Sequence, residues 1–217
     1  MHFLIPGGIG GGITTEQPTA GPPAVVAVAA SAGGVEALRA LVSMLPGDFP
    51  AAVLVVLHIP PAGPTVLPEI LSRAGPLPAR HPADGEPLAG GVILVAPPDR
   101  HLAVSESRAR VLADPRDHGH RPSADVLLRS AAGAFGAACC GMVLSGTMDD
   151  GAAGLAAVGR AGGLALVQDP AEALFPGMPR AAIEQADPQL IAPLSELASR
   201  VGTWLADRDG EAALPQP

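Results

Sequence analysis

The sequence predicts an α/β fold with a doubly wound, mostly parallel sheet, flanking helices and an antiparallel hairpin. Short apolar runs alternate with stretches of helical periodicity along most of the chain. This alternation is typical of strand–helix–strand units with right-handed crossovers. The chain has 217 residues, of which 48% are hydrophobic, so it is long enough to bury one substantial core.

The first half of the chain opens with a strand–helix–strand unit, followed by a stretch rich in glycine and proline. The elements expected there are a strand, a helix, two further strands and the two hairpin strands, at 25–30, 35–43, 53–57, 92–95, 101–104 and 110–113. In the second half, helices and strands alternate again. They are expected at 123–135 (helix), 141–144 (strand), from about Gly151 (helix), 164–167 (strand), 178–185 (helix), 190–191 (strand) and 195–205 (helix).

Both ends of the chain lack a periodic apolar face. Residues 1–22 contain a glycine-rich run and are expected to be a flexible leader, and the polar residues 207–217 are expected to be a flexible tail. One domain over 23–206 is therefore predicted.

Composition excludes several classes of function. The net charge is -8 and the 13 Lys and Arg residues are scattered, so a nucleic acid partner is not expected. No apolar stretch reaches the roughly 18 residues of a membrane span, and no signal peptide is apparent. The only cysteines, Cys139 and Cys140, are sequence neighbours and poorly placed for a disulfide or a metal site. A cytoplasmic protein without membrane insertion is the expectation.

Three reactive side chains follow predicted strands. Ser31 follows the first strand, His58 the second, and Asp150 lies in the loop after 141–144. Ligands of parallel sheets bind outside the carboxyl ends of the strands, so these side chains belong on one edge. A hydroxyl nucleophile, an imidazole base and a carboxylate that orients the base could meet there.

The residues after Ser31 suit an oxyanion site. Gly33 and Gly34 permit a sharp turn and a close approach of the backbone before the next helix. The free N–H groups at the start of that helix could stabilise a developing oxyanion.

Each segment also has a plainer interpretation when taken singly. Serine before two glycines is commonly a helix cap or a phosphate-binding turn, a lone histidine after a strand is commonly solvated, and Asp-Asp-Gly is commonly a turn. The joint placement of Ser31, His58 and Asp150 favours catalysis over these interpretations.

The three segments resemble, in the same order, the catalytic segments of CheB-type chemotaxis methylesterases. They read AASAGG at 29–34, LHIP at 57–60 and SGTMDDGAAG at 145–154. Further matches lie at 83–86, 96–101, 120–127 and 177–182. The resemblance covers about residues 24–205.

The resemblance implies a protein-glutamate methylesterase with Ser31, His58 and Asp150 as its catalytic triad. It also implies possible deamidation of receptor glutamines, no metal or organic cofactor, and a methylated chemoreceptor as partner. The oxyanion donor would be the backbone N–H of Thr147, and His120 and Arg121 would line the pocket. The chain departs from the family at Ala32, where threonine is usual, at Ala29, where glycine is common, and at Thr147, where methionine can occur.

The remaining expectations concern how the protein is regulated, which other functions it could have, and whether it binds a metal. Chemotaxis methylesterases usually carry an amino-terminal receiver domain, and only about 24 residues precede the first strand here. Either the catalytic domain is unregulated, or a separate protein regulates it. A non-catalytic signalling module and an esterase or amidase unrelated to chemotaxis are the alternative functions. The remaining histidines show no metal-ligand spacing, and no metal site is predicted: His81, His101, His118 and His120.

Overall fold

The structure, a computed structural model, describes residues 22, 24–58 and 66–212, and the side chains only as far as residue 208. Most of the predicted leader 1–22 and the last residues of the predicted tail lie outside this part. Within it, no helix is both long enough and apolar enough to cross a bilayer.

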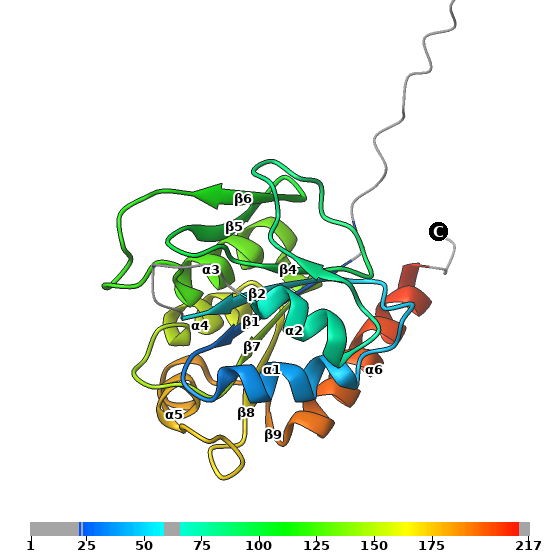
Figure 1. The fold of residues 1–217 in the computed structure, drawn as a ribbon. Helices are drawn as coiled ribbons and strands as arrows, with labels where there is room; N and C mark the ends of the chain where they lie inside the picture. The colour runs from blue at the N-terminus through cyan, green and yellow to red at the C-terminus, as the bar shows by residue number, and fades with distance from the viewer. Residues whose placement is uncertain (1–21, 23, 59–65, 213–217) are drawn as a thin grey trace, which may run out of the picture.

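A seven-stranded parallel sheet forms the centre of the molecule (Figure 1). Its strand order is β3-β4-β2-β1-β7-β8-β9. The strands, in chain order, are β1 (Val25–Ala30), β2 (Ala52–Leu57), β3 (Ala79–Arg80), β4 (Ile93–Val95), β7 (Cys139–Val143), β8 (Leu164–Gln168) and β9 (Leu190–Ala192). An antiparallel hairpin, β5 (His101–Ser105) and β6 (Arg108–Leu112), makes a separate two-stranded sheet. The predicted fold class is confirmed.

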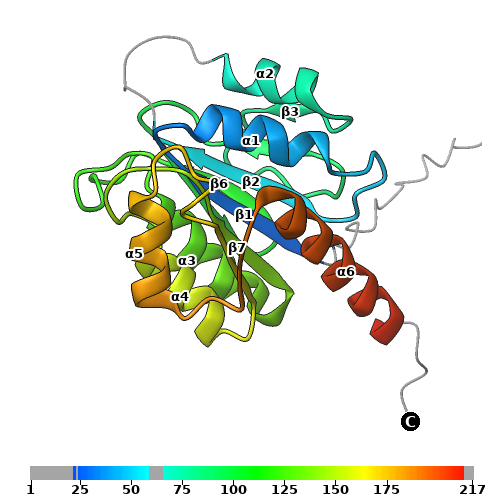
Figure 2. The same ribbon diagram turned by 90° about the horizontal axis from the view of Figure 1, so that it is seen from below.

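Helices cover both faces of the sheet (Figure 2). One face carries α1 (Gly34–Ser43), α2 (Leu67–Ala74) and α6 (Leu194–Ala212), and the other carries α3 (Ala124–Phe135), α4 (Ala152–Arg160) and α5 (Gly177–Ala186). A short 3-10 turn, η1 (Gly136–Ala138), joins α3 to β7. Alternate residues of β1 enter the two cores, Val26 and Val28 on the first face and Val25 and Ala27 on the second. Burial on both faces explains why β1 is a continuous apolar run.

Several element boundaries differ from the sequence prediction. The helix α2 and the strand β3 were not expected in the middle segment rich in glycine and proline. Pro68 lies in the first turn of α2, where proline is tolerated, and Leu67 and Leu71 supply its buried face. The helix α6 continues to Ala212, into the segment expected to be a tail, and β7 begins at Cys139, earlier than expected.

The two cysteines lie in β7 as free, buried thiols. Cys139 faces one core and Cys140 the other, because successive side chains of a strand point to opposite sides. Burial raises the pKa of the Cys139 thiol to about 12. The thiols are therefore protonated core residues.

The strand order places β1 at the topological switch point of the sheet. The chain leaves β1 toward β2 on one side and returns through β7 on the other. A crevice opens outside the carboxyl ends of strands at such a point. The segments that follow β1, β2 and β7 meet there.

Candidate active site

Strand register places Ser31 beside His58. The parallel strands β1 and β2 pair Ala30 with Leu57, and the backbone N–H of His58 donates to the carbonyl of Ala30 at 3.1 Å. Neighbouring strands lie about 4.8 Å apart. The next residue on each strand is therefore one of the two reactive side chains.

A third segment is tied to the same turn. The backbone N–H of Ser31 donates to the carbonyl of Ser145 at 2.9 Å. The Ser145 hydroxyl donates to the carbonyl of Ala32 at 2.8 Å and accepts from the backbone N–H of Phe175 at 3.0 Å. Ser145 thus joins the serine turn to the segments after β7 and β8, a role that the sequence did not single out.

Glycine is required at both positions of the turn. Gly33 has a φ of 69°, and a Cβ there would lie 2.7 Å from Ser145 Oγ. A Cβ on Gly34 would lie 2.7 Å from the side chains of Ala30 and Leu57. The close approach expected for these glycines is therefore present, and it allows α1 to begin directly behind Ser31.

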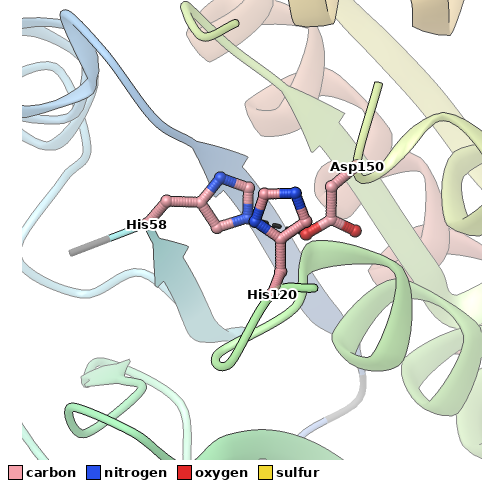
Figure 3. Close-up of side chains that lie close together, drawn as sticks. All are labelled: His58, His120 and Asp150. Carbon is pink, nitrogen blue, oxygen red and sulfur yellow. Dashed lines mark hydrogen bonds and ion pairs between the residues drawn. The ribbon is translucent and has the colours of Figure 1, made fainter. Parts of the chain in front are cut away.

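Asp150 holds the imidazole of His58 (Figure 3). The distance from His58 Nε2 to Asp150 Oδ2 is 2.6 Å, and the side chains are 13% and 4% exposed. An ionised carboxylate only accepts hydrogen bonds, so Nε2 carries the proton in this pair and the neutral ring has its lone pair on Nδ1. Figure 3 shows Nδ1 on the side of the ring away from Asp150.

The N-terminus of α3 provides the other contacts of Asp150. Its Oδ1 accepts from the hydroxyl of Ser123 and the backbone N–H of Asp125, both at 3.0 Å. Its Oδ2 accepts from the backbone N–H of Ala124 at 2.8 Å, in addition to His58. Each oxygen therefore receives two donors, which leaves the carboxylate little freedom to turn.

These donors also keep Asp150 charged. Burial by itself raises the pKa of this carboxyl, but the hydrogen bonds from His58 and from the backbone of Asp125 and Ala124 outweigh it and lower the pKa to about 2. Because the folded pKa lies below the ordinary value of 3.8, the resulting stabilisation is present above that value. It is lost as the pH falls from about 4 toward 2.

Several known proteins are similar to this chain in sequence and in fold. The family model described as CheB methylesterase matches residues 26–201. The chain belongs to the CheB methylesterase family. A protein-glutamate methylesterase/protein-glutamine glutaminase of Anaeromyxobacter dehalogenans is 43% identical over 195 residues, which are 87% of this chain and 57% of that protein. One of Myxococcus xanthus is 42% identical over 180 residues, 82% of this chain and 51% of that protein.

A solved structure agrees with the fold. The CheB methylesterase catalytic domain of Thermotoga maritima superposes with a TM-score of 0.78 at 26% identity, and the match covers 84% of this chain and 98% of that one. The chain spans about half the length of the curated CheB relatives that it matches.

Free backbone donors lie at the serine turn and beside it. Within the described residues, the N–H groups of Ala32, Gly33 and Thr147 donate to no acceptor. Thr147 follows Gly146, whose N–H donates to the carbonyl of Phe175 at 2.9 Å, so its backbone is held against the next segment. These N–H groups are available to stabilise an oxyanion, a contact that needs only the backbone of Thr147.

The ring of His120 lies against the ring of His58 (Figure 3). The two centroids are 4.3 Å apart and the planes differ by 15°. Paired backbone hydrogen bonds between His120 and Asp117, at 2.9 and 3.0 Å, hold this loop in place. His120 therefore covers one face of the His58 imidazole, a contact that the expected pocket-lining role did not specify.

The guanidinium of Arg121 is occupied by the loops around it. It donates to both oxygens of Asp99, at 3.0 and 2.9 Å, and to the carbonyls of Ala113 and Asp114. The sequence suggested that Arg121 lines the pocket. In the structure its guanidinium supports the loop that carries His120, and a role of Arg121 in lining the pocket stays a prediction.

Among the residues that the structure describes, two groups of side chains have the composition of metal sites. The ligand atoms of His58, His120 and Asp150 lie within 4.8 Å of one another, as do those of Asp117, His118 and Asp125. Two ligands of one tetrahedral Zn²⁺ would be about 3.3 Å apart. The separation of 2.6 Å between His58 and Asp150 is that of a hydrogen bond, so the first group would have to open to chelate an ion.

We expect the rate of ester hydrolysis to fall in acid as one proton binds His58. The base must be neutral to accept the serine proton, whereas Asp150, with a pKa of about 2, stays ionised throughout this range. The measurement is kcat/KM for a small ester between about pH 4 and pH 9. A rate that stays flat well below the reference imidazole pKa of about 6.5 would exclude His58 as the base.

Proposed function

We propose that this protein is a serine hydrolase that removes methyl groups from glutamate methyl esters on a chemoreceptor-like protein. The observation that carries the proposal is the meeting of Ser31, His58 and the buried Asp150 at one sheet edge, in a chain of the CheB family. The names of the relatives add glutamine deamidation, which would use the same acyl-enzyme. We place the activity in the cytoplasm.

The geometry supports a two-step mechanism. Nδ1 of His58 takes the proton of Ser31 as Oγ attacks the ester carbonyl, and backbone N–H groups, that of Thr147 among them, stabilise the oxyanion. The imidazolium returns the proton to the departing methanol, which leaves Ser31 acylated. Water, deprotonated by the same nitrogen, then attacks the acyl carbon and releases the glutamate, and the imidazolium returns the proton to Oγ of Ser31. Asp150 keeps the other nitrogen protonated in both steps.

Large apolar side chains beside the turn suit a protein substrate. Leu174, Phe175 and Met148 are 68%, 40% and 66% exposed. The Cβ of Leu174 and the ring of Phe175 adjoin Gly33, only two residues from the nucleophile. Apolar side chains three or four positions from an ester-bearing glutamate on a helix lie about 5–6 Å from it. They could pack on this rim while the ester reaches Ser31.

The deciding experiment measures methanol released from methyl-labelled receptor membranes. Release that depends on Ser31 supports the proposal. Hydrolysis of small esters without release from receptors would instead favour an esterase unrelated to chemotaxis. A folded protein without either activity would favour a non-catalytic signalling module.

Leu174→Asp tests the choice of a protein substrate. We expect about a tenfold lower kcat/KM on methylated receptor, because about 1.4 kcal/mol of apolar contact is lost, with little change on a small ester. The matched control is Met44→Asp, which charges a side chain that is 40% exposed at the far end of α1. Equal losses on both substrates would show that Leu174 acts on the chemistry and not on recognition.

A further inference from the structure

The N-termini of α3 and α4 each donate hydrogen bonds to a carboxylate that belongs to the other segment. Asp150, just before α4, accepts from the N-terminus of α3 as described above. In return, Oδ1 of Asp125, in the first turn of α3, accepts from the backbone N–H groups of Gly151 at 3.0 Å and Gly154 at 2.7 Å. Each carboxylate therefore accepts from the N-terminus of the other helix, and α3 in addition has a cap of its own in Ser123, whose hydroxyl accepts from the backbone N–H of Val126.

The helix α4 has no side-chain cap of its own. Its N-cap residue is Gly151, with a φ of 101° and no side chain to accept a hydrogen bond. Asp125, only 3% exposed, supplies the missing acceptor from outside the helix. A Cβ on Gly154 would lie 2.7 Å from the side chain of Leu128, so the two helices approach closely at this point.

The surroundings of Asp125 are highly charged. Its second oxygen accepts from Arg129 at 3.3 Å, and Arg129 also pairs with Asp117. Asp150, Asp117 and His118 are further titratable groups close to it, and His120 and Asp149 line the same pocket. Burial raises the pKa of Asp125, and the charge of Asp150 adds to this, while the glycine N–H groups and Arg129 favour the ionised form.

We propose that Asp125 is a positioning residue for the triad. By capping α4 it fixes the residues directly after Asp150, and so the direction in which Oδ2 meets His58. Its carboxylate interacts electrostatically with that of Asp150, the partner of His58. The kinetic consequences rest on the proposed hydrolase activity, whereas the effect on His58 does not.

Kinetics of Asp125→Ala and Asp125→Asn on a small ester test the positioning. The alanine variant leaves two N–H groups without an acceptor. We expect kcat to fall about 10- to 100-fold with little change in KM, as a misplaced catalytic group does. The asparagine variant keeps one acceptor oxygen for both glycines and should recover most of kcat. Glu69→Gln, which removes an exposed charge from the first turn of α2, is the matched control. A folded Asp125→Ala protein with wild-type kcat would overturn the proposal.

Titration of the His58 imidazole by NMR tests the charge independently of any substrate. We expect the midpoint to move to lower pH by about 0.5 unit in Asp125→Asn, since a neighbouring negative charge is lost, and to stay in place in Glu69→Gln. If Asp125→Ala does not fold, this titration decides, and an unmoved midpoint in Asp125→Asn overturns the proposal. A wild-type protein that releases no methanol from receptors would contradict the proposed function while leaving this result readable.

Discussion

Replacing Ser31 with alanine is expected to lower the turnover of methylated receptor and of small esters by roughly 10^4-fold or more, as loss of a triad serine does in other serine hydrolases. The substitution removes the oxygen that would be acylated. The backbone contact of residue 31 with Ser145 does not involve the side chain, so the fold should survive. Methanol release and circular dichroism on the same preparation measure the two effects.

Ser43→Ala is the matched control for this experiment. Ser43 ends α1 and donates only to the carbonyl of Ala40 at its own helix, so the variant should keep full activity. A folded Ser31→Ala protein with turnover near that of Ser43→Ala would exclude the serine mechanism.

The second large effect is expected for Asp150→Asn, with a loss of roughly 10^3- to 10^4-fold in turnover. Both carboxylate oxygens receive donors, so the amide NH2 must face either the His58 and Ala124 pair or the Ser123 and Asp125 pair. In the first orientation, His58 can pair only through an unprotonated Nε2, and its proton moves to Nδ1, where the base is needed. In the second, the amide opposes the N-terminus of α3.

The neighbouring carboxylate provides the control. Asp149 is exposed, and its backbone carbonyl, not its side chain, accepts from Ala152 at 3.1 Å. Asp149→Asn should therefore cost little activity. Turnover of both folded variants on methylated receptor compares the two residues, and a severe loss confined to Asp149→Asn would mean that the wrong carboxylate has been assigned.

The sequence predicts the positions of those site residues that directly follow neighbouring strands of the sheet. Ser31 and His58 directly follow strands that prove to be neighbours, so local patterns and the rule for parallel sheets are enough to bring them together. The placement of Asp150 depends on the loop after β7. Three of its four donors, the Ser123 hydroxyl and the backbone N–H groups of Ala124 and Asp125, come from the N-terminus of α3, which no local pattern connects to that loop.

The sequence did not predict the contacts that long loops make in the folded protein. The stacking of His120 on His58 depends on the path of the chain between β6 and α3. The pairing of Arg121 with Asp99 depends on two loops that meet only in the folded protein. The helix α2 was missed because its first turn contains Pro68 and the glycine- and proline-rich surroundings suggested a loop. In each case tertiary packing decided the outcome over local preference.

The ring nitrogen that Asp150 occupies determines how covalent reagents would react with this histidine. In the serine-protease arrangement the carboxylate holds Nδ1, which leaves Nε2 to act as base. Here the carboxylate holds Nε2, so an electrophile delivered to the serine side would alkylate His58 at Nδ1. A synthetic histidine methylated at Nδ1 would block the base directly, whereas the isomer methylated at Nε2 would break the bond to Asp150.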